Sequence, residues 1–153
     1  MLTKQQANIL LQNLKTEEGT PLTLDDHNDC TLISDEQRLI YFHYDDERQE
    51  IQFCSVIDTL PSDEEKRAQI LKKFMRANFM WFDSLGSTFA VEPQNNFLML
   101  QKNYRDGSAL ESNFKSTITQ FETEIEFWQE RFSDNPEEIE IPTIPATYNL
   151  LWV

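Results

Sequence analysis

The chain has 153 residues, of which 39% are hydrophobic and 11 are phenylalanine, so it is long and apolar enough for one globular domain and is not intrinsically disordered. Its 27 acidic and 13 basic residues give a formal net charge of −14, which excludes the usual electrostatics of binding to nucleic acid phosphates or to an anionic membrane surface. No apolar run approaches the ~20 residues of a membrane span and no secretory signal pattern opens the chain, which predicts a cytoplasmic protein.

The first predicted element is a helix from Thr3 to Lys15. Thr3 and Gln6 have the spacing of a capping box, in which each side chain bonds to the backbone of the other residue. Ile9 lies off the apolar stripe of this helix and is a candidate for a binding surface. The stripe itself, at helical spacing, is formed by Ala7, Leu10, Leu11 and Leu14.

Short apolar runs separated by polar turns follow and predict an antiparallel meander. Leu22 and Leu24 alternate in the first run, and the second begins at Cys30. The third run is 39–44 and the fourth is 51–60. Since the third run is apolar on both faces, we expect either cover on both sides of the sheet or a groove that a partner fills.

A central helix is predicted from Ser62 to Phe82, with a capping box formed by Ser62 and Glu65. Its apolar surface is wider than the stripe of roughly 100° that covers one face of a monomer. Two interpretations stay open: a helix in a deep core, or a helix between its own sheet and a symmetry mate. The stripe and its extensions comprise Ile70, Leu71, Phe74, Met75, Asn78, Phe79, Trp81 and Phe82.

The next part of the chain predicts a hairpin and a long helix. Strands at 88–91 and 97–104 flank a loop of about five residues. Ser108 and Glu111 have capping-box spacing at the start of the last helix. Together with the earlier elements this gives an α+β fold. The stripe of the last helix, which we expect to pack across the sheet, is Leu110, Phe114, Ile118, Phe121, Ile125, Trp128 and Phe132.

The sequence changes character at residue 133. Three prolines and a run of glutamates predict that residues 133–153 form a tail after a domain comprising residues 1–132. Leu150, Leu151 and Trp152 make the end of this tail apolar. It either folds back on its own domain or serves as a short docking segment for another protein.

The sequence gives little support for a catalytic or metal-binding site. The cluster at 25–30 holds three Asp, one His and one Cys, but it lacks the glycine bend and distal glutamate of a cation loop. Two His and two Cys in the whole chain are few for a zinc site, and we expect Cys30 and Cys54 to be free thiols. His43 sits in an apolar strand. We therefore predict no catalytic, metal-binding or cofactor-binding residue, and the excess apolar surface indicates a binding protein.

The arrangement resembles a known family. Met75 to Asn78 is similar to a Leu-x-Ala-Asn signature, with Met75 in place of the usual Leu, and Trp128 stands where the last helix of that family commonly carries Trp. On these stretches, over residues 3–132, the chain resembles the class I effector chaperones of bacterial type III secretion systems, the Tir-chaperone-like family. The other similar stretches are 19–26 with 30–32, 56–61, and 86–92 with 97–100.

The resemblance implies a twisted antiparallel sheet of about five strands flanked by three helices, in the order α-βββ-α-ββ-α, and a homodimer formed by the central helix and the adjoining strand. It implies a non-enzymatic protein of the bacterial cytoplasm that binds the non-globular N-terminal segment of an effector. Such a chaperone keeps the segment competent for secretion and is recognised by the export ATPase. A second chaperone is a further candidate partner.

Two alternatives remain beside this interpretation: a non-secretory adaptor or regulator with the same fold, and an enzyme with a site at His43 or at residues 25–29. Pattern and resemblance together assign residues to the two expected interfaces. The expected dimer interface is Phe74, Asn78, Trp81, Phe82, Phe89 and Val91, and the expected effector-binding residues are Ile9, Leu10, Leu14, Leu22, Leu24 and Leu32.

Overall fold

The computed structural model describes residues 1–14, 19–34, 38–79 and 86–134. It has the predicted α+β class and the predicted element order. The helices are α1 (Lys4–Gln12), α2 (Glu64–Ala77) and α3 (Glu111–Asp134), and the strands are β1 (Asp29–Ile33), β2 (Leu39–Asp45), β3 (Glu50–Thr59), β4 (Thr88–Glu92) and β5 (Phe97–Tyr104).

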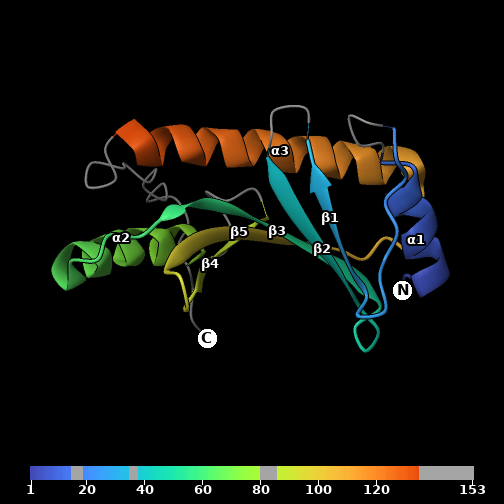
Figure 1. The fold of residues 1–153 in the computed structure, drawn as a ribbon, viewed down its shortest axis with the longest axis horizontal. Coiled ribbons are helices and arrows are strands. Elements are labelled where there is room, and N and C mark those ends of the chain that lie inside the picture. Colours follow the sequence, from blue (N-terminus) through green and yellow to red (C-terminus); the bar gives the residue numbers. More distant parts are fainter. Residues whose placement is uncertain (15–18, 35–37, 80–85, 135–153) are drawn as a thin grey trace, which may run out of the picture.

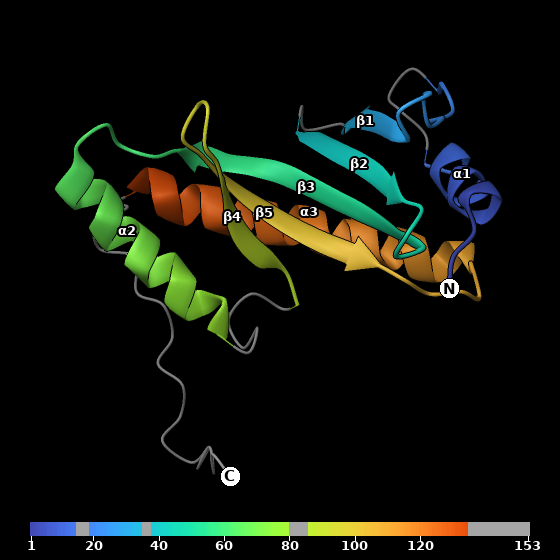
Figure 2. The same ribbon diagram turned by 90° about the horizontal axis from the view of Figure 1, so that it is seen from below.

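The five strands form one antiparallel sheet in the order β1-β2-β3-β5-β4. β1 and β4 are therefore the edge strands. Figure 1 shows α3 lying along one face of the sheet, while Figure 2, seen from below, shows the opposite face in front of α3. α1 lies near β1 at one end of the molecule, and α2 lies beside β4 at the other. We call the face turned away from α3 the open face.

The core forms where α3 packs on the sheet. Phe121 meets Phe53 of β3 with ring centroids 4.9 Å apart, and Phe114 lies 5.0 Å from Tyr104 of β5. These rings come from the predicted stripe of the last helix, so its role in packing across the sheet is confirmed. Leu110 is the exception, because it precedes the helix and is 52% exposed.

The residues at the starts of α1 and α2 show which of the predicted capping boxes form. At α1 the Thr3–Gln6 capping box is present in both directions. At α2 the prediction of Ser62 is wrong: Asp63 caps the helix, and its Oδ1 accepts the N–H of Lys66 at 2.8 Å. A carboxylate makes the stronger, charge-assisted bond.

The Ser108 capping box of the last helix is also wrong. Ser108 lies in a turn, where its own N–H donates to Asp106 Oδ1 at 2.9 Å. Ala109 then takes a left-handed φ of 49°, and α3 begins only at Glu111. The side chain of Asp106 therefore organises the turn that precedes the helix.

The identity of the α2 cap gives a direct test. Asp63→Ala is expected to lower the free energy of unfolding by about 1 kcal/mol, because it removes the acceptor for a helix N–H and a negative charge at the positive end of the dipole. Ser62→Ala, on the exposed neighbouring residue, is the matched control and should change it by less than about 0.5 kcal/mol. Urea unfolding measures both, and a larger loss for Ser62→Ala would restore the original prediction.

Three further predictions have different outcomes in the structure. Leu22 and Leu24 do not form a strand, because after Pro21 the segment is irregular and leads into the turn at Asp25. The hairpin between β4 and β5 is confirmed, with a loop of residues 93–96 and the pairing Glu92↔Phe97. The first two residues of the predicted tail, Ser133 and Asp134, are the last two of α3. The rest of the tail lies outside the described residues, so the domain division stays a prediction. None of the described helices is long and apolar enough to cross a membrane.

Candidate functional site

The residues predicted to bind an effector lie mostly inside the protomer. Only Ile9 is exposed, with 52% of its surface accessible. The other residues of the set are Leu10, Leu14, Leu22, Leu24 and Leu32, each exposed by 8% or less. They belong to one hydrophobic core with α3. In this conformation they therefore lie beneath the surface near α1 and β1 and contribute little to it.

Two of these leucines do reach a concave surface. Leu14 and Leu32 line a pocket of about 460 Å³, which we call the α1–α3 pocket. Asn13 closes it on one side, where its Nδ2 donates to Glu111 Oε2 across 3.3 Å. The leucines supply an apolar floor beneath a polar rim, an arrangement that can receive an apolar side chain of a peptide. The remaining lining residues are Ser34, Lys115, Ile118, Thr119 and Glu122.

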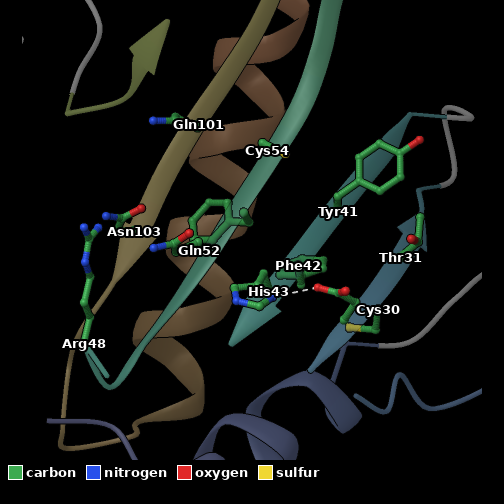
Figure 3. A pocket seen from close by; sticks show the side chains of 12 residues that line it. Cys30, Thr31, Tyr41, Phe42, His43, Arg48, Gln52, Cys54, Gln101 and Asn103 are labelled. Carbon is green, nitrogen blue, oxygen red and sulfur yellow. Dashed lines mark hydrogen bonds and ion pairs between the residues drawn. The ribbon is translucent and has the colours of Figure 1, made fainter. Parts of the chain in front are cut away.

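A second pocket lies on the open face and has a volume of about 510 Å³ (Figure 3). Strand register puts its outward side chains in two cross-strand rows. The first row is Asp29, His43, Gln52 and Asn103, and the second is Thr31, Tyr41, Cys54 and Gln101. The sequence analysis did not predict this site, although strand alternation from buried Phe42 and Phe53 would have turned these residues outward.

The polar groups of this open-face pocket suit hydrogen bonding and offer little for catalysis. His43 Nδ1 lies 2.7 Å from Asp29 Oδ1, and both side chains are about half exposed. Burial raises the pKa of the Cys30 thiol to about 12 and also raises that of Cys54, so neither is an activated nucleophile. Among the described residues, no three His, Cys, Asp or Glu side chains are grouped to hold a metal ion.

Asp25 acts in the predicted polar turn. Its Oδ1 accepts the N–H of Asp29 at 2.9 Å and that of His27 at 2.8 Å, while its own N–H donates to Asp29 O at 2.9 Å. The carboxylate therefore closes the turn before β1. The bond from the Asp29 N–H, followed by that from His27, lowers the pKa of Asp25 below its usual value.

This lowered pKa predicts an acid-dependent loss of stability. The contribution of Asp25 is present above its unfolded pKa, about 3.9, and is lost as pH falls through the lower folded value. Asp25→Asn should therefore reduce stability at pH 7 and make it fall less steeply below pH 4. Asp26→Asn, on the exposed neighbour, is the control with the same charge change. Urea midpoints between pH 7 and pH 2.5 give the comparison, and identical acid profiles for the two variants would contradict it.

Five of the six residues predicted to form a dimer interface fall into three groups. Phe74 and Phe89 are buried within the protomer, at 1% and 6% exposure, with ring centroids 4.6 Å apart. Val91 is 40% exposed on the edge strand β4. Trp81 and Phe82 lie outside the described residues. The interface itself stays a prediction. Phe74 and Phe89, which are buried, would pack beneath such an interface.

Asn78 has a specific role in the protomer. Its Oδ1 accepts the N–H of Phe89 at 2.7 Å, and its Nδ2 donates to Phe89 O at 3.0 Å. One side-chain amide thus satisfies both outward backbone groups of a residue in the edge strand β4, as a neighbouring strand would. Asn is suited to this because its amide carries a donor and an acceptor. The bond pair fixes the end of α2 against β4.

A buried ionic cluster went unpredicted. Lys102 Nζ of β5 lies 3.0 Å from Glu124 Oε1 of α3, with side-chain exposures of 12% and 4%. Ser87 Oγ also donates to Glu124. Alternation with buried Leu98 and Leu100 turns Lys102 toward α3, and this sequence signal, a Lys at an inward position, could have revealed the pair.

The model of the Tir chaperone protein (CesT) family matches residues 9–129. The chain belongs to the Tir chaperone protein (CesT) family. A search of curated protein sequences finds no match.

Solved structures agree with this CesT-family membership in fold. One similar chain comes from the ExsC-ExsE complex, with a TM-score of 0.70 and 19% identity over 85% of this chain and 96% of that one. Another comes from the HopA1-SchA chaperone-effector complex, with a TM-score of 0.62 and 15% identity over 83% of this chain and 95% of that one. The resemblance recognised in the sequence is thus confirmed by the family match, and the two likenesses extend it to the fold.

Proposed function

We propose that this chain is a type III secretion chaperone of the bacterial cytoplasm that binds the non-globular N-terminal segment of one or more effectors. It keeps that segment competent for secretion and helps to bring it to the export apparatus, without catalysing a reaction. The observation that carries the proposal is the family match over residues 9–129. Of the two solved structures with a similar fold, the HopA1-SchA structure is a chaperone-effector complex by name.

The surface features support peptide binding. Ile9 is exposed on α1, and the α1–α3 pocket with Leu14 and Leu32 opens nearby. An unfolded segment loses entropy on binding, so its contacts must be distributed over a large area with apolar anchors. Two separate pockets, this one and the one on the open face, suit a partner that runs along the surface.

Self-association is the second part of the proposal. Met75 and Phe79 of the α2 region are 71% and 40% exposed, and Val91 on β4 is 40% exposed. Large apolar side chains exposed together mark an interaction surface. Since α2 and β4 contact each other, we propose that these residues meet their equivalents in a second copy, with an isologous interface.

Co-purification tests the function. The tagged chain, with and without residues 133–153, would be recovered from its native bacterium and the bound proteins identified by mass spectrometry. We expect a larger secreted protein held through a protease-sensitive N-terminal segment. Loss of that protein on truncation would assign the tail to docking. Recovery of only a compact, protease-resistant regulator would replace the chaperone function by the adaptor function.

A further inference from the structure

The open face differs in charge from the rest of the chain. Charged residues make up 26% of the sequence, and the net charge is −14. Yet two adjacent cross-strand rows of this face contain none, and we call them the uncharged rows. The first consists of Thr31, Tyr41, Cys54, Gln101 and Thr88. The second consists of the pair Ile33 and Leu39 on β1 and β2, and of Val56, Met99 and Ala90 on β3, β5 and β4.

The charged side chains at the open-face pocket, beside the first of these rows, have partners within the chain. Asp29 pairs with His43 at 2.7 Å. Arg48, also at the open-face pocket, lies 3.7 Å from Asp45 Oδ2 and 3.9 Å from Glu50 Oε1. A charged partner side chain at this pocket would therefore lose hydration, while the nearby charges already have partners within the chain. Such a surface selects for an uncharged partner.

On each edge strand of the sheet, one residue has its outward N–H and C=O groups already bonded within the chain; we call this an edge cap. Asp25 occupies the outward N–H and C=O of Asp29 on β1, and Asn78 occupies those of Phe89 on β4. A strand added at either edge would have to displace one of these side chains to pair with the capped residue. The caps thus favour contact over the face of the sheet at these positions.

The chemistry of the uncharged rows suits a peptide. Gln101, with Gln52 and Asn103 beside it in the pocket, carries an amide that can donate and accept. Tyr41, Ile33 and Leu39 are 42%, 52% and 42% exposed and offer apolar area. Amides complement peptide groups and polar side chains, whereas the apolar residues complement an aliphatic or aromatic anchor.

We propose that the uncharged rows bind an uncharged stretch of the effector segment, in which Asn, Gln, Ser or Thr residues flank one apolar anchor. This inference rests on the proposed function and specifies the chemistry of one part of the path of the effector. The stretch lies across the strands of the open face, with its anchor near Tyr41 and Cys54. The acidic remainder of the chain takes no part in its selection.

Opposite charges placed at one position provide the test. Gln101→Lys and Gln101→Glu are both expected to weaken binding of uncharged peptides by about tenfold or more, because either charge must be desolvated. Gln120→Lys and Gln120→Glu, at an exposed Gln of α3, should leave binding unchanged. Thr31→Lys and Thr31→Glu, at an exposed residue of the same row, repeat the test if a Gln101 variant fails to fold by circular dichroism.

The probe is a phage library of random 12-residue peptides selected on the full chain. The same variants would also be compared for the amount of secreted protein that they co-purify. We expect selected peptides to lack Asp, Glu, Lys and Arg at their central positions. Charged peptides whose preference reverses between Gln101→Lys and Gln101→Glu would overturn the inference, as would selected peptides that bind all variants equally.

Two further outcomes separate this inference from the proposed function. If the Gln101 and Thr31 variants co-purify as much secreted protein as the unaltered chain, the open face is not a contact and the chaperone function still stands. A changed mass of the free chain in light scattering would assign the face to self-association and also overturn the inference. Failure of the unaltered chain to capture any secreted protein would instead refute the function itself.

Discussion

Lys102→Met is expected to lower the free energy of unfolding by about 3–5 kcal/mol, the largest effect of any single charge removal described here. Glu124 is 4% exposed, so without Lys102 its carboxylate is buried with Ser87 as its remaining donor. A buried carboxylate without its opposite charge is strongly destabilising. Urea unfolding at pH 7 measures the loss.

The double variant Lys102→Met/Glu124→Leu separates the buried charge from the packing. It should recover about half of the loss or more, since removal of both partners leaves no buried carboxylate, while the Ser87 hydroxyl loses its Glu124 acceptor. Lys115→Met is the control, because Lys115 pairs with Glu111 on the exposed surface of α3, each side chain 50% exposed; it should cost less than about 1 kcal/mol. If Lys102→Met cost no more than this control, the pair would have to be hydrated.

The same cluster illustrates what sequence patterns miss. The spacing of the apolar residues of α3 predicts the helix and its buried face, because the apolar period follows directly from 3.6 residues per turn. The same spacing would place Glu124, which precedes Ile125, on the solvated side of the helix. Only the strand alternation around Lys102 reveals that a carboxylate must lie opposite. Charge at an inward strand position is therefore more informative than charge on a helix.

Two other features could not be predicted from the pattern along the chain, because that pattern does not show which segments become neighbours in the fold. Leu22 and Leu24 alternate like a strand, but strand formation also requires a neighbouring backbone, and the Asp25 turn takes that position at β1. The open-face pocket escaped prediction for a related reason. Its residues come from β1, β2, β3, β5 and the turn before β3, and only the strand register brings them together.

The central helix shows the limit of the apolar pattern most clearly. A wide apolar surface indicates two contacts, yet it does not say which residues face the own core and which face a partner. Phe74 and Met75 are adjacent in sequence, but Phe74 is 1% exposed and Met75 is 71% exposed. The wide apolar pattern directed attention to this helix, while the division between its two faces needed the structure.

This division predicts opposite results for two adjacent substitutions. Phe74→Ala is expected to lower the free energy of unfolding by about 3–5 kcal/mol. Its ring packs against both Phe89 and Trp128, with centroids 4.6 Å and 5.8 Å away, and its loss leaves a cavity that those rings cannot fill by collapse. Met75→Ala removes a side chain that is exposed in the protomer and should change protomer stability by less than about 0.5 kcal/mol.

Self-association should show the reverse order. In multi-angle light scattering over a dilution series, Met75→Asp is expected to shift the chain toward a folded monomer, because it puts a charge into the proposed isologous contact twice. Phe74→Leu, which keeps most of the buried volume, should leave the mass unchanged. A dimer that persists in Met75→Asp but dissociates in Phe74→Leu would mean that α2 turns the Phe74 side outward on association, and the burial described for the protomer would then belong to the monomer alone.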